Sequence, residues 1–322
     1  MRTFTRLVLI AAVALVVAGS AAAQSGYPNK LIKLVVPFPS GSATDMVARI
    51  MAAPISAAMG QPIVVDNKGG ADGAIAGEFV ARSAPDGYTL FLGTNSPIAA
   101  VPVLHKNPPY NSATDFTPIS FVGRTTFYLV INSELPVKTL DELLKYARAN
   151  PGKLNYASSS TTGIVSMAQL ASLGGLQMVH VPYKGEAAAV LDLVANRVQL
   201  MFASSINAPA FIRQGKIRAL ATTNLERSRG LPDVPTMSEA GMPQFSISPW
   251  LALFGPANMP KEIVDRLNKE VAAAFARPDV MAQMEKQTFP AQASTPEYLA
   301  QYVKDQLEIW RKTAAEAGIR PE

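Results

Sequence analysis

Short apolar runs alternate with helix-like segments along most of the chain, and few folds accommodate that order. Residues 31–36, 63–65 and 88–92 are such runs, and each leads through a short loop into a segment of helical periodicity. Continuous apolar runs of this length are typical of strands that are buried on both faces of a parallel sheet. The sequence therefore predicts an α/β fold of doubly wound, mainly parallel sheets flanked by helices.

A second set of strand–helix units follows in the middle of the chain. Thr139, with Glu142 three residues later, is a typical helix start, and the Asn-Pro-Gly sequence at 150–152 ends that helix. The chain is long enough for about two domains. Beyond residue 152 we expect helices near 164–173 and 186–196, and strands at 154–157, 178–181, 198–202 and 218–221.

Two long extended stretches, residues 116–132 and 245–255, stand out from this alternation. We interpret them as crossings of the chain between two lobes, with lobe 1 at residues 24–124 and 247–322 and lobe 2 at residues 125–246. The alternative is one large sheet with a long insertion. Two amphipathic helices are expected to close the chain, and the last carries an apolar stripe: Leu299, Val303, Leu307, Trp310 and Ala314.

The first 23 residues have the composition of an export signal. Arg2 and Arg6 precede the apolar run 7–18, and the small residues 21–23 offer a cleavage site. We therefore expect export, with cleavage near Ala23. The chain has no cysteine, so the fold must stand without disulfides, and no thiolate is available for catalysis or metal binding.

The charge pattern and the short motifs argue against several function classes. The net charge of +5 comes from Lys and Arg residues that are scattered singly, which is not the basic stripe of a nucleic-acid-binding surface. No nucleophile elbow, phosphate-binding loop or dinucleotide fingerprint occurs in the sequence. His105 is expected in a surface loop and His180 in the core, and neither has a Cys, Asp or Glu nearby at ligand spacing. We therefore expect neither catalysis nor a cofactor.

Four loops that follow predicted strands share one chemical character. Residues 37–44, 93–97, 157–163 and 203–207 offer glycine backbone, hydroxyl and amide groups without a charged side chain. In doubly wound sheets ligands bind beyond the carboxyl ends of the strands, where these loops lie. A helix that begins after such a loop directs unpaired N–H groups at the ligand, so the pattern favours an anion held without an arginine. Each loop alone is also an ordinary strand–helix connection, and the prediction depends on their convergence.

Asp45, in the first turn of the first helix, admits two interpretations. Its carboxylate can bond back toward Ser42 as a capping box, or it can face the cleft, where its charge would oppose an anion. We favour the structural role.

Seven stretches resemble one known family, in order, over most of residues 30–247. They are "KLVVPFPSGSATDMVAR", "IVVDNKGGADGAIAG", "APDGYTLFLGT", "DFTPISFVG", "NPGKLNYASS", "VHVPYKGEAAAVLDLVANRVQLMFA" and "IRALATTNLERSRGLPDVPTMSEAGMPQF". On these stretches the chain resembles the Bug family (Bordetella uptake gene), the extracytoplasmic solute receptors of tripartite tricarboxylate transporters.

The resemblance implies a two-lobed periplasmic binding protein of type II, which closes on a small carboxylated solute and presents it to a membrane permease. In that family the carboxylate is held mainly by backbone and hydroxyl groups. Carried over to this chain, the implied ligand-binding residues lie in the first loop, the loop after the "NY-S" strand, the "GT" loop, the cleft mouth and the end of the late strand: Phe38, Ser40, Gly41, Ser42, Ala43; Ser158, Ser159, Ser160, Thr161, Thr162; Thr94, Asn95; Tyr183; and Ala203, Ser204.

The chain departs from the family pattern in these loops. Ser40 and Ser42 stand where the first loop usually has Pro and Gly, and the "NYASSSTTG" run is shorter than usual and lacks the His that follows it. Ala203 and Ser204 stand where many members carry an acidic residue. A cleft without an acidic partner would leave an ammonium group uncompensated. We therefore expect zwitterionic amino acids to bind poorly, and dicarboxylic or aromatic carboxylic acids to bind better.

Two alternatives stay open at this point. One is an exported α/β hydrolase, which a nucleophile within hydrogen-bonding reach of His105 or His180 would favour. The other is a solute sensor of the same fold that serves a signalling kinase instead of a permease. The main prediction is a monomeric solute-binding protein without a cofactor, a metal or a nucleic-acid partner.

Overall fold

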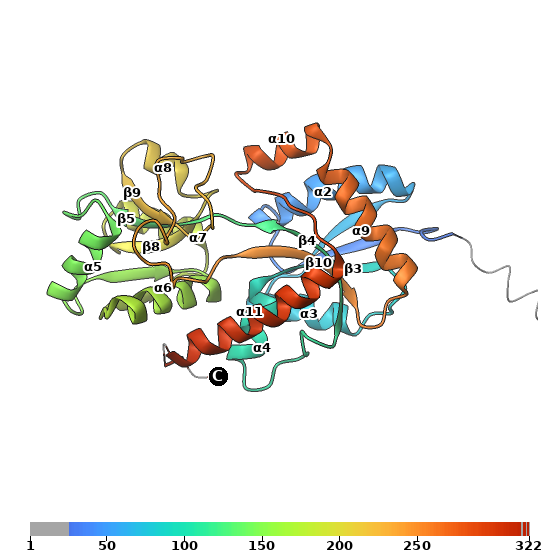
Figure 1. Ribbon diagram of the computed structural model, residues 1–322, viewed down its shortest axis with the longest axis horizontal. Coiled ribbons are helices and arrows are strands. Elements are labelled where there is room, and N and C mark those ends of the chain that lie inside the picture. Colours follow the sequence, from blue (N-terminus) through green and yellow to red (C-terminus); the bar gives the residue numbers. More distant parts are fainter. Residues whose placement is uncertain (1–25, 317, 320, 322) are drawn as a thin grey trace, which may run out of the picture.

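The computed structural model describes residues 26–316, 318, 319 and 321, in which two five-stranded sheets lie toward opposite ends of an elongated molecule (Figure 1). The export signal predicted at residues 1–23 lies outside the described residues. The first sheet has the strand order β2-β1-β3-β10-β4, and the second has the order β7-β6-β8-β5-β9. Two separate sheets exclude the alternative of one large sheet with an insertion.

The strands follow the predicted runs to within a few residues. Those of the first sheet are β1 (Ile32–Val36), β2 (Ile63–Asn67), β3 (Thr89–Thr94), β4 (Phe116–Arg124) and β10 (Trp250–Pro256). Those of the second sheet are β5 (Phe127–Asn132), β6 (Asn155–Ser158), β7 (Val179–Pro182), β8 (Leu200–Ser204) and β9 (Ile217–Thr222).

In each sheet four strands run in one direction and one runs against them. β1 pairs in parallel with β2 and β3, whereas β10 is antiparallel to both β3 and β4. In the second sheet β6 pairs in parallel with β7 and β8, and β5 is antiparallel to β8 and β9. The predicted α/β fold with mainly parallel sheets is therefore confirmed, and the reversed strand of each sheet comes from one of the two long extended stretches.

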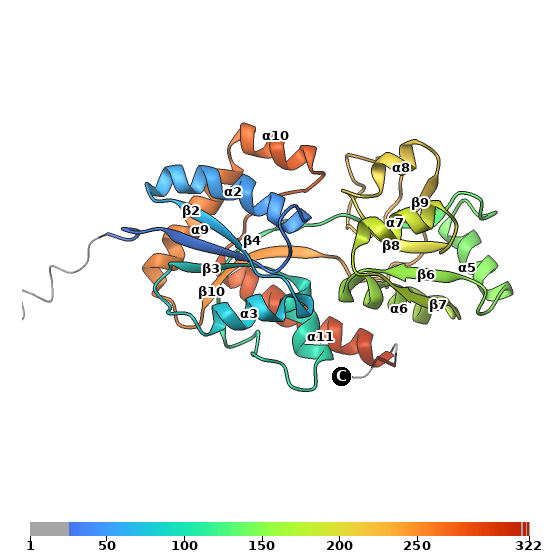
Figure 2. The same ribbon diagram turned by 180° about the vertical axis from the view of Figure 1, so that it is seen from behind.

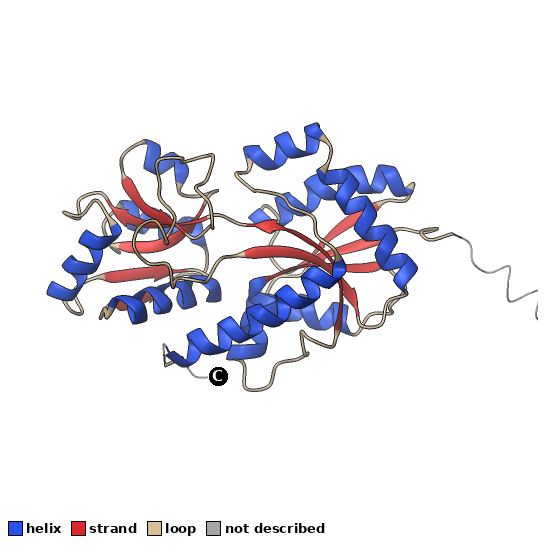
Figure 3. Ribbon diagram, viewed as in Figure 1, coloured by secondary structure: helices blue, strands red, loops and turns tan. Residues whose placement is uncertain are grey.

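The two lobes are joined where these stretches pass between the sheets (Figure 3). β4 ends at Arg124 and β5 begins at Phe127, so the first stretch contributes one strand to each sheet. The chain returns to the first sheet along the segment that enters β10. The lobe bounds at residues 124 and 247 stay a prediction.

Helices cover both faces of each sheet (Figures 2 and 3). Those of the first lobe are α2 (Ala43–Met59), α3 (Ala74–Ala81), α4 (Val101–Leu104), α9 (Lys261–Phe275), α10 (Pro278–Lys286) and α11 (Pro296–Glu316), with the short turns η1 (Ala71–Gly73) and η2 (Ser96–Ala100). Those of the second lobe are α5 (Leu140–Ala149), α6 (Thr161–Gly174), α7 (Glu186–Val194) and α8 (Pro209–Arg213).

Alternate residues of the central strands supply the two cores of each lobe. In β1, Leu34 and Val36 pack with α2, α9 and α10, whereas Val35 packs with α3, α4 and α11. In β5, Leu129 packs toward α5 and α6, and Tyr128 packs toward α7 and α8. This alternation follows from the two-residue period of a strand and gives each sheet apolar side chains on both faces.

The end of the chain has one helix more than predicted. Where the sequence predicts two closing amphipathic helices, the structure has α9, α10 and α11. The division falls at Pro278, which is the first residue of α10 and follows Arg277 in an extended conformation. Proline lacks the N–H that would continue α9, but suits the first turn of a new helix. The apolar stripe predicted for the last helix is buried in α11 as expected.

Candidate functional site

The junction between β1 and α2 is built around the cap that the sequence predicts. Ser42 is extended (φ −70°, ψ 162°), and its Oγ accepts a hydrogen bond of 3.3 Å from the N–H of Asp45. Gly41 has φ +81°, a left-handed conformation that favours glycine. Figure 2 shows this junction facing the second lobe.

Asp45 is buried and neutralised within its own lobe. Its Oδ2 accepts hydrogen bonds from the N–H of Gly41 (2.9 Å) and from Arg49 Nε (3.0 Å), and its Oδ1 accepts one from Asn67 Nδ2 (3.0 Å). Burial alone would raise the pKa of this carboxyl, but the hydrogen bonds from Arg49, Gly41 and Asn67 outweigh it and hold the pKa below its ordinary value. Asn67 Nδ2 also donates to the carbonyl of Phe38. Asp45 thus fixes the shape of the loop, as the structural interpretation requires.

The first turn of α2 leaves backbone donors at the cleft edge. The first bond of the helix runs from Met46 N to the carbonyl of Ser42, so the N–H groups of Ala43 and Thr44 have no acceptor in the helix. No hydrogen bond to them occurs elsewhere in the described part of the chain. Ser40 is exposed, with its hydroxyl 3.5 Å from Asp45 Oδ2.

The start of α6 in the second lobe repeats this arrangement. Ser160 is extended, and its Oγ accepts from the N–H of Gly163 at 3.2 Å. The first bond of the helix runs from Ile164 to the carbonyl of Ser160, which leaves the N–H groups of Thr161 and Thr162 without an acceptor in the helix. Ser159, before the cap, is half-buried.

The loops after β3 and β6 meet across the two lobes. Asn95 Nδ2 donates to Thr162 Oγ1 at 2.6 Å, and Ser96 Oγ lies 3.2 Å from the same oxygen. These three residues are each only 3% exposed, so the contact forms a closed seam rather than an open floor. Thr94 Oγ1, one residue earlier, is buried without a hydrogen-bond partner.

Contacts between loops join three of the four predicted segments. Gly73 lies against both Pro37 and Pro97, where a Cβ would come within 2.8 Å and 3.2 Å of their Cβ atoms. The loops after β1 and β3 are therefore neighbours, and the seam ties the second of them to the loop after β6. The fourth segment, after β8, instead bonds to the connection between β4 and β5, where Ser205 N donates to the carbonyl of Thr126.

His180 in β7 contacts a predicted site residue. Its Nε2 lies 2.6 Å from Ser158 Oγ, its ring stacks on Tyr156 at 4.9 Å, and burial lowers its pKa. This is the nucleophile within reach of a histidine that the hydrolase alternative requires. Among the described residues, however, no carboxylate bonds to the His180 ring to orient it, so a triad is not assembled. His105 caps α4 through its backbone N–H.

Tyr183 is turned along α7. Its N–H donates to the carbonyl of Ser158 at 2.8 Å, and its hydroxyl donates to Asp192 Oδ2 at 2.7 Å. The phenol is therefore held by a residue two turns into α7.

An acidic side chain occupies the end of β8, which the sequence analysis missed. The carboxylate of Glu186, the first residue of α7, accepts a hydrogen bond from the N–H of Ser204 and is also bonded by the side chains of Ser204 and Asn207. Burial raises the pKa of Glu186 even though these hydrogen bonds oppose the shift, and no Lys or Arg among the described residues pairs with it. A carboxyl group therefore lies beside Ser204, although neither Ala203 nor Ser204 is itself acidic.

The chain position of Glu186 explains why it was missed. The strand order β7-β6-β8 lets a side chain that follows β7 reach the end of β8, although the two residues are 18 positions apart in sequence. Its neighbourhood within the "YKGEAAAV" stretch gave no sign of that contact.

No group of three or more His, Asp or Glu side chains in residues 26–316, 318, 319 and 321 is arranged to hold a metal ion. None of the helices formed by those residues combines the length and apolarity needed to cross a membrane.

Comparison with known proteins gives consistent matches over most of the chain. Residues 47–319 match the family described as tripartite tricarboxylate transporter family receptor. Protein BugT of Bordetella pertussis is 35% identical over 326 residues, covering 98% of both chains.

Solved structures also match. The structure of R. palustris Rpa4515 with adipate covers 92% of this chain and 100% of its own, with a TM-score of 0.83 and 35% identity. MatC (Rpa3494) from Rhodopseudomonas palustris with bound malate covers 89% of this chain and 99% of its own, with a TM-score of 0.77 and 32% identity. The fold and these relatives are those of solute-binding receptors and not of enzymes.

Proposed function

The chain belongs to the tripartite tricarboxylate transporter receptor family, and we propose that it captures a small carboxylate between its two lobes in the periplasm and delivers it to a membrane permease of the tripartite tricarboxylate type. In this proposal the protein acts as a monomer, and the solute is a dicarboxylic or aromatic carboxylic acid.

The observation that carries the proposal is the pair of helix starts at α2 and α6. Each is capped by a serine, Ser42 or Ser160, and each leaves two first-turn N–H groups without an acceptor. A carboxylate at such a helix end gains charge-assisted hydrogen bonds and the favourable field of the helix dipole. No arginine clamp is required, and a micromolar affinity needs only about 8 kcal/mol in total.

The binding site in this proposal keeps the residues expected from the sequence, with one addition and two reassignments. Phe38, Ser40, Gly41, Ser42 and Ala43 form one wall, and residues 158–162 form the other. Asn95 belongs to the seam that closes the floor, and the hydroxyl of Tyr183 is held by Asp192. Glu186 is added at the end of β8 beside Ser204.

The ligands of two relatives support a carboxylate. Rpa4515 is described with adipate and MatC with malate, and both proteins share more than 30% identity with this chain. Glu186 places a carboxyl group beside Ser204, so an amino acid belongs in the acid panel as well.

Thermal shift measurements with an acid panel test this function. Adipate, malate, benzoate and aspartate are compared with adipamide, which has the same carbon chain as adipate but no carboxylate. An acid present at a hundred times its Kd adds about 2.7 kcal/mol to the free energy of unfolding, so the melting temperature rises with its concentration. The proposal fails if no acid shifts the melting temperature, or if adipamide shifts it as much as adipate does.

A further inference from the structure

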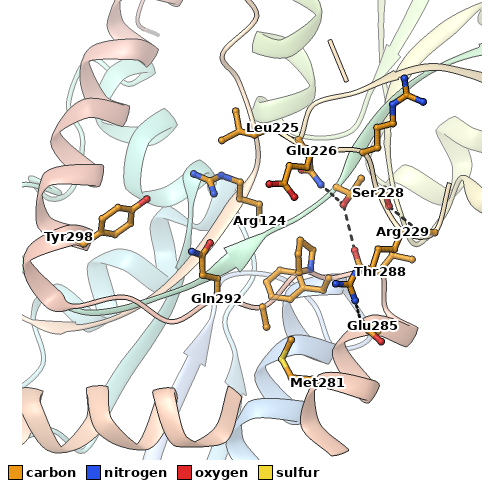
Figure 4. A pocket seen from close by; sticks show the side chains of 17 residues that line it. Arg124, Leu225, Glu226, Ser228, Arg229, Met281, Glu285, Thr288, Gln292 and Tyr298 are labelled. Carbon is orange, nitrogen blue, oxygen red and sulfur yellow. Dashed lines mark hydrogen bonds and ion pairs between the residues drawn. The ribbon is translucent and has the colours of Figure 1, made fainter. Parts of the chain in front are cut away.

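A cavity of about 870 Å³ lies between the lobes, away from the predicted carboxylate site (Figure 4). Its walls are formed by the end of β4, by the loop after β9, and by α10 with the segment that leads into α11. The volume is within the range of small-molecule sites. None of the residues expected to bind the carboxylate lines it.

The strand order separates this cavity from the predicted site. In the first sheet β10 lies between β3 and β4, and in the second sheet β5 lies between β8 and β9. The predicted loops follow β1, β3, β6 and β8, whereas the cavity lies at the ends of β4 and β9. The two places are therefore on opposite sides of the reversed strands.

Arg124 gives the cavity a positive group without an acidic partner. It is half-buried at the end of β4, and its guanidinium lies over the rings of Phe121 (5.3 Å) and Tyr302 (5.6 Å). No carboxylate lies within ion-pair distance of it in the part of the chain that the structure describes. Arg124 also makes a side-chain hydrogen bond with Tyr302. Neither that hydroxyl nor the ring faces neutralise its charge, so the remaining donors of the guanidinium are available to an anion.

The other two arginines of the cavity are already paired. Arg227 bonds to Glu239 Oε2 at 2.8 Å, and Arg229 bonds to Glu285 of α10. Arg124 is thus the cation that an incoming acid would meet without displacing a carboxylate.

Apolar surface lies at the same end of the cavity. Leu225, at the rim, is 81% exposed, which makes it an unusually open leucine. The half-exposed Tyr298 stacks on Tyr302 at 6.0 Å with its ring at 13°, so it presents a fixed aromatic face. Figure 4 shows Arg124, Leu225 and Tyr298 together at one end of the cavity. A guanidinium flanked by an open leucine and a tyrosine ring matches a molecule with one acidic end and an apolar body.

We propose that this cavity is a second binding site, which takes an organic monocarboxylic acid with an aromatic or aliphatic body through Arg124, Leu225 and Tyr298. The acid group pairs with the guanidinium, whose planar donors suit a carboxylate. The body of the ligand covers Leu225 and the ring of Tyr298. This site is distinct from the loops after β1 and β6 and does not require that they bind the transported solute.

Glu226 is a carboxylate in the cavity that would repel a bound acid. It lines the cavity, is exposed, and has no ion pair among the described residues, so its charge opposes an anion there. Removing that charge with Glu226→Gln is expected to tighten acid binding by about two- to fivefold, as a partly screened repulsion would predict.

Calorimetric titration of the full mature chain with benzoate tests the proposal, with acetate as the probe that lacks an apolar body. We expect benzoate to bind more tightly than acetate. Arg124→Gln should weaken benzoate by roughly tenfold or more, since a charge-assisted pair is lost. Arg124→Lys keeps the charge but loses the planar donors, so its affinity for benzoate should lie between those of wild type and Arg124→Gln.

Two further variants separate this site from the first. Arg82→Gln removes an equal charge from an exposed position on the C-terminal side of α3 and should leave benzoate binding unchanged. Because aromatic acids are also candidate ligands of the first site, Ser42→Asp removes that contribution and should leave the Arg124-dependent binding of benzoate in place. The proposal is overturned if wild-type protein binds no benzoate, if folded Arg124→Gln binds it as wild type does, or if Ser42→Asp abolishes it.

Discussion

At the scale of single residues, Ser42 and Asp45 share the start of α2 but have different roles. The carboxylate of Asp45 accepts hydrogen bonds from Gly41, Arg49 and Asn67, so it holds the loop in shape and does not face a ligand. Ser42 caps the helix beside the free N–H groups of the first turn. The two roles predict different consequences for substitution.

Ser42→Asp should preserve the fold and lose the ligand. Asp is as good a helix cap as Ser, but it places a negative charge where the carboxylate is proposed to bind. We expect adipate affinity to fall by roughly tenfold or more, which titration calorimetry would measure. Thr139→Asp makes the same change at the cap of α5 and should leave the affinity unchanged. Equal affinity in Ser42→Asp and wild type would mean that the acid binds elsewhere.

Glu186 predicts a dependence of stability on pH. Because burial raises its pKa above the ordinary value of 4.5, the folded protein binds this proton more tightly than the unfolded chain does. The favourable contribution is therefore complete below about pH 4.5 and is lost as pH rises through the folded pKa.

Glu186→Gln removes this titration while keeping the size of the side chain. The melting temperature of the variant relative to wild type should rise as pH increases above about 4.5. Glu142→Gln, at the exposed start of α5, is the matched control in a helix first turn. A difference from wild type that stays constant over this pH range would contradict the assignment of a raised pKa to Glu186.

At the scale of helices and strands, the seam between η2 and α6 determines how the lobes meet. Asn95, Ser96 and Thr162 come from two lobes and exclude solvent at their contact. The seam therefore holds η2 and α6 together at one contact between the lobes.

Thr162→Val should weaken that contact. Valine has the shape of threonine, but it leaves the buried Asn95 Nδ2 without its acceptor, which costs about 1–3 kcal/mol. Urea unfolding would show the loss. Thr161→Val changes a neighbour whose side chain makes no hydrogen bond in the described structure, and its effect should stay within about 0.5 kcal/mol. Equal stability of the two variants would mean that the seam does not contribute as described.

Elements with local signals were predicted from the sequence, whereas long-range contacts were not. The cap of α5 at Thr139 and the buried stripe of α11 depend on residues a few positions apart, and both are present in the structure. The break at Pro278 was missed because proline also occurs in first turns and at loops. Glu186 was missed because its contact depends on which strands are neighbours in the sheet.

The cavity at Arg124 was not predicted either, because it too depends on contacts between segments that are distant in the sequence. Its walls come from residues 124–126, 224–230 and 281–298, which meet only when both lobes and α10 are in place. Arg124 was not predicted as a site residue, because the pattern that predicts the carboxylate site lies in loops without charge. Its significance arises from the absence of a carboxylate around it in the described structure, which periodicity does not reveal.

At the scale of the whole molecule, the order of strand and helix units was sufficient to predict two α/β lobes joined by two crossings. The topology adds that the reversed strands β5 and β10 lie between two distinct regions of the interlobe space. One region is bordered by the capped helix starts, and the other holds Arg124. We assign the transported acid to the first region.

A crystal structure of the protein with adipate tests that assignment most directly. It should show a carboxylate oxygen within about 3.2 Å of the first-turn N–H groups of α2, at Ala43 and Thr44, with α6 opposite and no arginine paired to that acid group. Adipate bound with both carboxylates remote from the starts of α2 and α6, and with one of them paired to Arg124, would contradict it.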